Sequence, residues 1–504
     1  MGFVLIAVLS LSIFSLCYLY LKFIKTPLKI QRHFRQQGIG GPNYNPISGN
    51  SDELQRLMIA EGKLSSKSES LNHDQVVRKV MPFYHFWSKI YGDQFLFWFG
   101  SKPRLAITDP DMTKEILLNT SGSFTKTRVN PLVKGLFGEG IVYLEGEQWA
   151  VHRKITSQAF NMERIKELIP EIVASTKSLL DKMEAKLGEE NGLELDVYKE
   201  FNNLSADVIS RTAFGSNFEE GKQIFELQDQ LVRIAAEAIR SVYIPGFKYL
   251  PTKKNRLSWK LQQGSKEMIT KIIEKNKKTR ENPKALLSLL MSPYKKGNEE
   301  RRLSLDEIVD ECKTFYFAGK ESTANLLTWV FVLLGENQQW QEKAREEVSR
   351  NDDLPSAEHL SNFKMISLIL NEALRLYPAA PISVREAGKD VKVGGVYIPA
   401  RTQLFLAMTA VHHDRKIWGE DAQKFNPMRF MDSKKHMASY FPFGLGSRNC
   451  VGQNLAIVEA KIVVAMIVKK YKFVVSPSYV HSPIQALTVR PQFGAQMIFT
   501  PVTS

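Results

Sequence analysis

Cysteine is scarce in this chain of 504 residues, which carries only Cys17, Cys312 and Cys450. Three cysteines so far apart in the sequence cannot form a disulfide framework. This predicts a protein body on the reducing, cytosolic side of a membrane. The chain beyond its first segment also lacks a Pro/Gly/Ser-rich linker, a low-complexity run and an internal repeat. Its length could hold about three average domains, but the absence of any break favours one large domain.

Acidic residues are fewer than basic ones. Asp and Glu total 53 and Lys and Arg total 68, which gives a net charge of +15. The basic residues do not alternate with aromatic ones in a nucleic-acid-binding pattern, and we expect no nucleic-acid partner. They gather after residue 22 and between Lys253 and Arg280. That distribution suits an anionic membrane surface or an acidic protein partner. A solvated helix face is the alternative for the second group.

The N-terminal segment 1–21 has no charged side chain. About 20 apolar residues, each rising 1.5 Å in a helix, span the hydrocarbon core of a bilayer. A cleaved signal peptide has basic residues before its apolar run, whereas here they follow it. We predict an uncleaved single-span membrane anchor over 1–24 with the body in the cytosol, a Gly/Pro-rich connector over 25–50, and a globular domain over 51–504.

The globular domain is dominated by amphipathic helical patterns. The clearest starts at Ser304, where the sequence Ser304-Leu-Asp-Glu307 forms a capping box, and its apolar pattern continues to about Gly335. A helix of that length is expected to run through the centre of the fold. The segment 391–407 has β-branched and aromatic residues around a Gly-Gly turn and predicts a small β-sheet. The fold class is therefore mainly α with minor β.

The segment FPFGLGSRNCVG at 441–452 places Cys450 just before a predicted helix over 452–471. A helix N-terminus and the nearby Arg448 favour a thiolate. Zinc would need three or four Cys or His ligands at short spacing, and they are not present near Cys450 in the sequence. A protease nucleophile would need a base, but the preceding His412, His413 and His436 match no local protease signature. A thiolate ligand of haem iron remains.

The pattern Phe443-x-x-Gly446-x-Arg448-x-Cys450-x-Gly452 resembles the haem-binding signature of the cytochrome P450 superfamily. The resemblance implies that superfamily's fold and a haem b cofactor, with Cys450 as the axial iron ligand. Phe443 would shield the sulfur, Gly446 and Gly452 would let the backbone approach it, and Arg448 would bind a haem propionate.

Further motifs follow the order of the same superfamily. Glu372 and Arg375 share a helix face, which in isolation would indicate a surface ion pair. The resemblance implies instead that they lock the haem-side core together with Arg429. Met428 stands where the superfamily usually has glutamate, and the arginine is retained.

Three other residues are expected at the haem propionates by the same resemblance, namely Trp149, Arg153 and Arg385. For Trp149 and Arg153 the alternative is an exposed pair one helical turn apart. The resemblance also gives a structural role to His413-Asp414 and Trp418-Gly419.

The segment Ala318–Thr323, AGKEST, lies in the middle of the long predicted helix. Glycine there costs about 1 kcal/mol relative to alanine, and a buried carboxylate needs a partner. The resemblance implies an oxygen-activation groove in which Glu321 and Ser322 relay protons. Ser322 replaces the usual threonine, keeps the hydroxyl and loses the stiffness of a β-branched side chain. Lys320 is expected to pair with a neighbouring carboxylate or to alter water in the groove.

The residues in these motifs are most similar to those of plant microsomal members of the clan that oxidises hormones and terpenoids. This implies an NADPH- and O2-dependent monooxygenase in the endoplasmic reticulum membrane. Its partners would be membrane lipid, NADPH-cytochrome P450 reductase and a small hydrophobic substrate such as a terpenoid, steroid or plant hormone. Expected substrate contacts are 124–145, 236–250, Phe315 and Ala318. The alternatives are a hydroperoxide-rearranging enzyme of the allene oxide synthase type and a non-catalytic haem protein.

Overall fold

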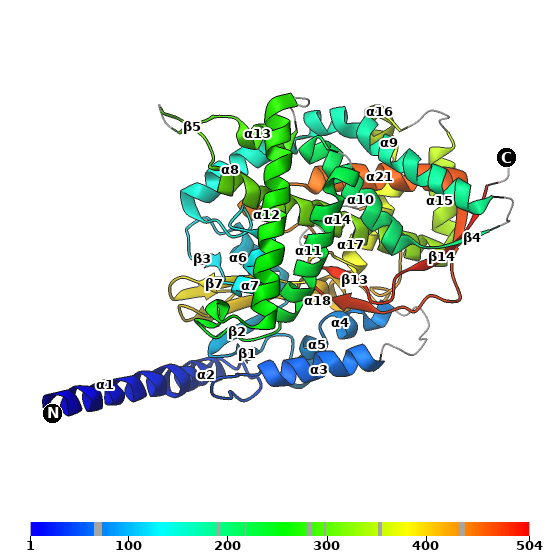
Figure 1. Cartoon of the computed structure of the whole chain (residues 1–504). Coiled ribbons are helices and arrows are strands. Elements are labelled where there is room, and N and C mark those ends of the chain that lie inside the picture. Colours follow the sequence, from blue (N-terminus) through cyan, green and yellow to red (C-terminus); the bar gives the residue numbers. More distant parts are fainter. Residues whose placement is uncertain are drawn as a thin grey trace.

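Helices form most of the computed structural model, which describes residues 2–64, 73–188, 192–216, 218–279, 285–296, 299–350, 355–432 and 439–502 (Figure 1). His436 and Arg280, named above, lie outside these residues. The predicted class, mainly α with minor β, is confirmed. The helices of the body are α3 (Ser51–Leu64), α4 (Val76–Val80), α5 (Pro82–Tyr91), α6 (Pro110–Leu118), α7 (Pro131–Phe137), α8 (Gly146–Ala159), α9 (Met162–Leu187), α10 (Val197–Phe214), α11 (Phe218–Ala238), α12 (Lys253–Thr279), α13 (Leu286–Met291), α14 (Leu305–Glu336), α15 (Gln338–Val348), α16 (Ala357–Asn362), α17 (Lys364–Leu376), α18 (Met408–His412), α19 (Arg415–Trp418) and α21 (Gln453–Lys470).

The N-terminal helix projects from the body as a rod (Figure 1). It comprises α1 (Gly2–Tyr20), a π-helical turn η1 (Leu21–Lys25) and α2 (Thr26–Gln36). Its stretch Phe3–Gln36 is long and apolar enough to cross a membrane, by length and composition. The apolar side chains of α1 are exposed on all sides, as expected for a segment that packs against lipid.

The connector predicted over 25–50 begins as helix, because α2 occupies its first half. Phe34 of α2 is fully buried in the core cluster that also contains Trp98. Gln37, at the end of α2, donates from its side chain to the carbonyl of Tyr397 at 3.0 Å and accepts from the backbone N–H of Tyr397 at 2.8 Å. The N-terminal helix is therefore fastened to the body directly, and within 25–50 only the turn-rich part after Gly38 lacks regular helix.

The long central helix is confirmed as α14, with 32 residues from Leu305 to Glu336. Both hydrogen bonds of the predicted capping box at Ser304 and Glu307 are present. Most of its side chains are buried, and it packs along α10, where Tyr316 stacks on Phe214 with 3.8 Å between ring centroids. A Cβ atom at Gly319 would lie 2.5 Å from Ile209 of α10. Glycine in this helix therefore lets two core helices approach closely.

The described strands form one five-stranded sheet, one three-stranded sheet and three pairs. The five-stranded sheet has the order β1-β2-β10-β7-β3. The small β-structure predicted over 391–407 is confirmed, since β8 and β9 pair around Gly394 and Gly395 and β10 follows. The strands are β1 (Leu96–Phe99), β2 (Lys102–Ile107), β3 (Phe124–Lys126), β4 (Leu193–Asp196), β5 (Tyr294–Lys296), β6 (Glu299–Arg301), β7 (Ser383–Ala387), β8 (Val391–Val393), β9 (Val396–Ile398), β10 (Gln403–Leu406), β11 (Tyr471–Val475), β12 (Pro483–Gln485), β13 (Val489–Pro491) and β14 (Gln496–Pro501).

Candidate functional site

The loop before α21 is folded tightly around Cys450. Gly444 and Gly446 have φ values of +74° and +72°, a region that glycine adopts without strain. A Cβ atom at Gly446 would lie 2.5 Å from the carbonyl oxygen of Leu117. The backbone N–H of Cys450 donates to the carbonyl of Phe443 at 2.8 Å. These contacts fix the direction in which the thiol leaves the backbone.

The Cys450 thiol is accessible, yet surrounding protein desolvates it and raises its pKa. A thiol can be both accessible and desolvated when it faces a space enclosed by the protein. The backbone N–H groups of Gly452 and Gln453 and the charge of Arg153 act in the opposite direction and favour the thiolate. A Cβ atom at Gly452 would meet no protein atom within 4 Å, so the protein around it gives no steric reason for that glycine.

Trp149 and Arg153, on successive turns of α8, contact different parts of this loop. The Arg153 guanidinium donates to the carbonyl oxygen and to the side-chain oxygen of Asn449, both at 2.6 Å. The Trp149 ring lies 4.4 Å from the guanidinium carbon of Arg448. Arg448 also donates to the carbonyl of Leu144 at 2.8 Å. The α8 pair therefore supports the Cys450 loop at Asn449 and Arg448, and a direct contact with a propionate stays a prediction for both Trp149 and Arg153.

A cluster of three cations lies beside this loop. Lys126 of β3 stands directly opposite Arg385 of β7 in the sheet register. Burial, together with the charges of Arg385 and Arg448, lowers the pKa of Lys126 to about 7. Burial also lowers the pKa of Arg385 and of Arg448. The charge of the nearby Glu145 carboxylate acts in the opposite direction and favours a higher pKa for Lys126 and Arg448.

This cluster fits the two carboxylates of a haem. Like charges opposite one another on paired strands are destabilising, and buried charges need compensation. One glutamate cannot neutralise three cations, whereas two added propionates would. Arg385 and Arg448 were predicted for this place from the motifs, whereas Lys126 was not. Only the pairing of β3 with β7, which are far apart in the sequence, could have revealed it.

Glu372 and Arg375 of α17 form an ion pair with no exposed side-chain surface. Two guanidinium nitrogens of Arg375 donate to the two carboxylate oxygens at 2.8 Å each. A third nitrogen donates to the carbonyl of His412 at 2.7 Å. Such a bidentate geometry satisfies both charges inside the protein.

Arg429 completes the group from the short helix η4 (Pro427–Phe430). It reaches Glu372 at 3.4 Å and also donates to Asp421 and to the carbonyl of Trp418. The structure thus brings Glu372, Arg375 and Arg429 together. Met428 is 42% exposed, so the missing glutamate at that position leaves no gap in the buried network.

One face of α14 is accessible to solvent in the middle of the helix. Ala318 is exposed and Gly319 and Ser322 are half-buried, in a helix whose neighbouring residues are buried. The Ser322 hydroxyl donates to the carbonyl of Ala318, one turn earlier, at 2.6 Å. Phe315, expected to contact substrate, lies in the core and stacks on Phe160 at 5.4 Å. Of the two α14 residues expected to contact substrate, Ala318 is on the open face and Phe315 is not.

Glu321 points about 100° from Ser322 around the axis of α14, as successive residues on a helix do. Its carboxylate is buried and accepts a hydrogen bond from the Thr488 hydroxyl at 2.9 Å. Lys320 pairs with Asp229 of α11 at 2.6 Å, which confirms the expected pairing with a carboxylate. The acid and the alcohol predicted to work together thus point in directions about 100° apart. Thr488 was not among the residues predicted from the sequence.

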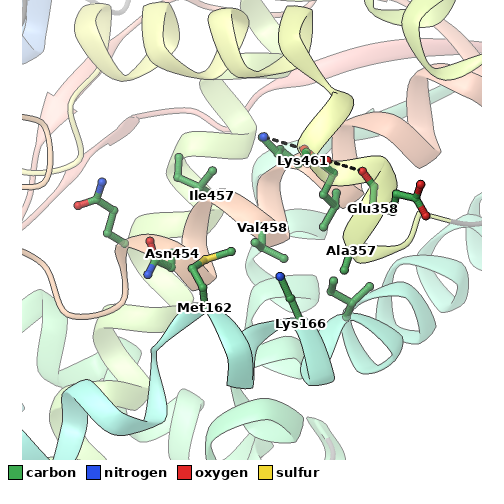
Figure 2. Close-up of a pocket in the computed structure, with 12 residues that line it drawn as sticks. Met162, Lys166, Ala357, Glu358, Asn454, Ile457, Val458 and Lys461 are labelled. Atoms are coloured by element: carbon green, nitrogen blue, oxygen red, sulfur yellow. Dashed lines mark hydrogen bonds between the residues drawn. The ribbon is translucent and has the colours of Figure 1, made fainter.

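A groove of about 570 Å³ lies between α9, α16 and α21 (Figure 2). Gln453 and Asn454, at the start of α21, also line the groove. They follow Cys450 closely in the sequence. Met162 and Val458 contribute apolar surface, and the other lining residues are Lys166, Ile169, Ala357, Glu358, Leu360, Ser361, Ile457 and Lys461. The Lys461 ammonium donates to the carbonyl of Leu360 at 3.0 Å, and burial lowers its pKa.

Comparison with known proteins agrees with this geometry. A family model described as Cytochrome P450 matches residues 71–499. Cytochrome P450 734A1 of Arabidopsis thaliana is 43% identical over 495 residues, which cover 95% of this chain and 93% of that protein. Cytochrome P450 CYP749A22 of Panax ginseng is 38% identical over 512 residues, which cover 98% of this chain and 96% of that protein.

A solved structure shows the same fold. The heme domain of cytochrome P450DA superposes with a TM-score of 0.74 at 22% sequence identity, covering 86% of this chain and 96% of that one. The family model and the relatives together confirm the resemblance stated from the motifs. The chain belongs to the cytochrome P450 family of haem-containing monooxygenases.

Proposed function

We propose that this protein hydroxylates a small hydrophobic molecule such as a terpenoid, a steroid or a plant hormone, at the expense of NADPH and O2. The substrate RH, O2, NADPH and a proton give ROH, water and NADP+. The observation that carries this proposal is the open face of α14, where the Ser322 hydroxyl stands beside Ala318 with the carboxylate of Glu321 one residue earlier. An acid and a hydroxyl are the groups needed to supply protons during oxygen reduction.

The cofactor is haem b in this proposal, with Cys450 as the axial ligand of its iron. When bound, haem supplies the iron at which O2 is activated, and a thiolate ligand favours cleavage of the O–O bond. The N–H groups of Gly452 and Gln453 stabilise the sulfur as a thiolate, and Phe443 shields it. Arg448, Arg385 and Lys126 would hold the propionates.

The other site residues hold the Cys450 loop and its neighbouring segments in place. Gly446 allows the loop to pass over the backbone of Leu117. Trp149 keeps the Arg448 guanidinium in place, and Arg153 fastens Asn449 next to the sulfur. Glu372, Arg375 and Arg429 hold α17 and the segment around Trp418 together beneath the site.

The substrate is expected to meet an apolar lining. Phe317 of α14 packs on Phe137 with 4.9 Å between ring centroids. Val133 and Leu136 of α7 and several residues of α11 join them in one cluster. These residues belong in part to the segment 124–145 expected to contact substrate. Hormones or terpenoids remain the proposed substrate class, from the resemblance of the motifs, and the relatives are cytochromes P450 of plants.

The electron donor is NADPH-cytochrome P450 reductase, which docks on the side of α21 and the Cys450 loop. The groove there has an apolar lining with Lys166 and Lys461 on its walls (Figure 2). Lysines at such a surface complement an acidic flavoprotein and accelerate encounter. The net charge of +15 supports the same interaction.

We place the protein in the endoplasmic reticulum membrane, with one span and the catalytic domain in the cytosol. Lys22 and Lys25 follow the apolar helix α1 directly, and basic residues next to a span favour the cytosolic side.

Expression with a plant reductase in microsomes tests the function. The reduced protein with carbon monoxide is expected to show the absorption band of a thiolate-ligated haem, and Cys450→Ala is expected to lose that band. Screening diterpenoids, steroids, cytokinins and fatty acids should reveal a hydroxylated product that requires NADPH. A protein with intact Cys450 and no such band would refute the haem site. NADPH-independent turnover of a fatty-acid hydroperoxide would favour the allene oxide synthase type of chemistry.

A further inference from the structure

The carboxylate of Glu321 is held by a hairpin that is distant in the sequence. Its Oε1 atom accepts from the Thr488 hydroxyl at 2.9 Å. Glu321 and Thr488 are 5% and 9% exposed, so water does not replace this bond easily. A buried carboxylate that loses such a donor must find another partner.

Asn325 fixes the direction of that hydrogen bond. It lies one turn after Glu321 on α14, and its amide nitrogen donates to the Thr488 oxygen at 2.9 Å. An amide nitrogen can only donate and a hydroxyl has a single hydrogen. Because Thr488 accepts from Asn325, its own hydrogen is available for Glu321. The three side chains therefore form a directed chain from Asn325 through Thr488 to Glu321.

The hairpin that carries Thr488 is firmly attached at the next residue. The N–H of Val489 donates to the carbonyl of Ala379 at 3.1 Å, and its carbonyl accepts from the indole N–H of Trp329 at 3.2 Å. The preceding residue, Leu487, packs against the apolar cluster that contains Phe317. Thr488 is thus supported by α14 itself and lies beside the expected substrate region.

A competing cation lies close to Thr488 in the sequence. Arg490 belongs to β13, two residues beyond Thr488, which lies in the turn just before that strand. The charges of Tyr198 and Glu321 offset the effect of burial and raise the pKa of Arg490, and its guanidinium reaches the Tyr198 hydroxyl at 3.5 Å. Without the Thr488 hydroxyl, the carboxylate of Glu321 would be drawn toward this guanidinium.

We propose that Thr488, oriented by Asn325, is a positioning residue that holds Glu321 against the attraction of Arg490. The hydroxyl keeps the carboxylate at one place beside α14, from which it can serve the proton transfer at Ser322. This inference rests on the proposed function of Glu321. In the productive reaction the two electrons of NADPH and two protons reduce one oxygen atom to water. In the unproductive one, the same electrons and protons convert O2 to H2O2, with NADPH oxidised to NADP+.

Removal of the hydroxyl tests the proposal through the ratio of product to NADPH consumed. One hydrogen bond is worth about 0.5–1.5 kcal/mol, so Thr488→Val is expected to lower that ratio about 2- to 12-fold, to release H2O2 and to raise the solvent deuterium isotope effect on product formation. Thr488→Ser keeps the hydroxyl and should restore the ratio. Thr328→Val is the matched control, because the Thr328 hydroxyl is also buried and donates to the carbonyl of Ala324, within α14.

The role of Arg490 gives a sharper test. If its charge draws Glu321 away, Thr488→Val combined with Arg490→Gln should recover a higher ratio than Thr488→Val alone. No recovery, or an unchanged ratio in Thr488→Val, would overturn the proposal.

A readout independent of turnover is the thermal unfolding of the haem-loaded protein. The effects of Thr488→Val and Glu321→Leu on stability should be non-additive, since both remove the same bond, whereas Thr328→Val and Glu321→Leu should add. Additive effects of the first pair would contradict the direct bond. The same measurements separate failure of the proposed function from failure of this inference. If the proposed function of Glu321 is wrong, Glu321→Gln would leave the ratio of product to NADPH unchanged. Failure of this inference alone would leave Glu321→Gln impaired and Thr488→Val normal.

Discussion

Lys126 and Arg385 are directly paired across the antiparallel strands β3 and β7. Two cations in that arrangement repel one another, and burial with the charges of Arg385 and Arg448 lowers the pKa of Lys126 to about 7. The pair is costly in the protein alone and becomes favourable when carboxylates of a bound group stand between them. In the proposed function, these residues would therefore lower the stability of the protein alone and raise its affinity for haem.

Replacing Lys126 by methionine is expected to weaken haem binding. One partly buried ion pair contributes about 1 kcal/mol, so haem dissociation should accelerate about 5-fold, as measured by transfer to an excess of apomyoglobin. Lys472→Met, at an exposed lysine in β11, is the control and should leave the rate unchanged. A normal rate in Lys126→Met would show that Lys126 does not hold a propionate.

The pair of Glu372 and Arg375 is expected to be essential for a stable fold. Removing one partner of a buried ion pair leaves an uncompensated charge and costs about 3–5 kcal/mol. Glu372→Ala should therefore abolish the carbon monoxide band and lower the unfolding temperature strongly. Asp111→Ala, which breaks the exposed pair with Lys114, should change the unfolding free energy by less than about 1 kcal/mol. A folded, haem-loaded Glu372→Ala protein would refute the role of this pair.

Glu459 of α21 gives a pH dependence of stability. Burial raises its pKa to about 8, although the Ser205 hydroxyl donates to it at 2.7 Å. The folded protein binds this proton more tightly than the unfolded chain does. Stability is therefore unaffected by Glu459 below about pH 4.5, and falls by about 1.4 kcal/mol per pH unit as the pH rises toward 8. Glu459→Gln removes this loss, so its unfolding temperature should exceed that of the wild type increasingly toward pH 8. Parallel pH curves would show that Glu459 does not titrate in this range.

The lysines of the groove between α9, α16 and α21 are expected to control reduction by the reductase. Lys166→Glu with Lys461→Glu should slow the first electron transfer, measured by stopped-flow, and weaken its dependence on ionic strength, because charge steering is screened by salt. Lys389→Glu, at an exposed residue between β7 and β8, should have no effect. Equal rates in both variants would indicate docking elsewhere.

Ser322 is expected to tolerate the usual threonine. Its hydroxyl bonds to the carbonyl of Ala318, and threonine can form the same bond with a stiffer side chain. Ser322→Thr should raise the amount of product per NADPH, and Ser322→Ala should lower it about 100-fold if the hydroxyl takes part in proton transfer. Equal ratios in all three proteins would remove Ser322 from the proposed site.

Features that depend on short stretches of sequence could be predicted well. The apolar run of α1, the capping box at Ser304, the helix after Cys450 and the turn at Gly394 each depend on neighbouring residues, and all are present in the structure. The five fixed positions around Cys450 also lie within ten residues. The family could therefore be recognised without knowledge of the fold.

Contacts between distant segments could not be predicted. Lys126 is opposite Arg385 because β3 and β7 pair in one particular register, and a shift of β3 by one residue would turn Lys126 to the other face. Glu321 bonds to Thr488 because a hairpin near the C-terminus packs on the middle of α14. The sequence by itself determined which chemical groups the site has. Only the tertiary structure decided which of them meet, because side-chain contacts depend on strand register and helix packing between segments separated by hundreds of residues.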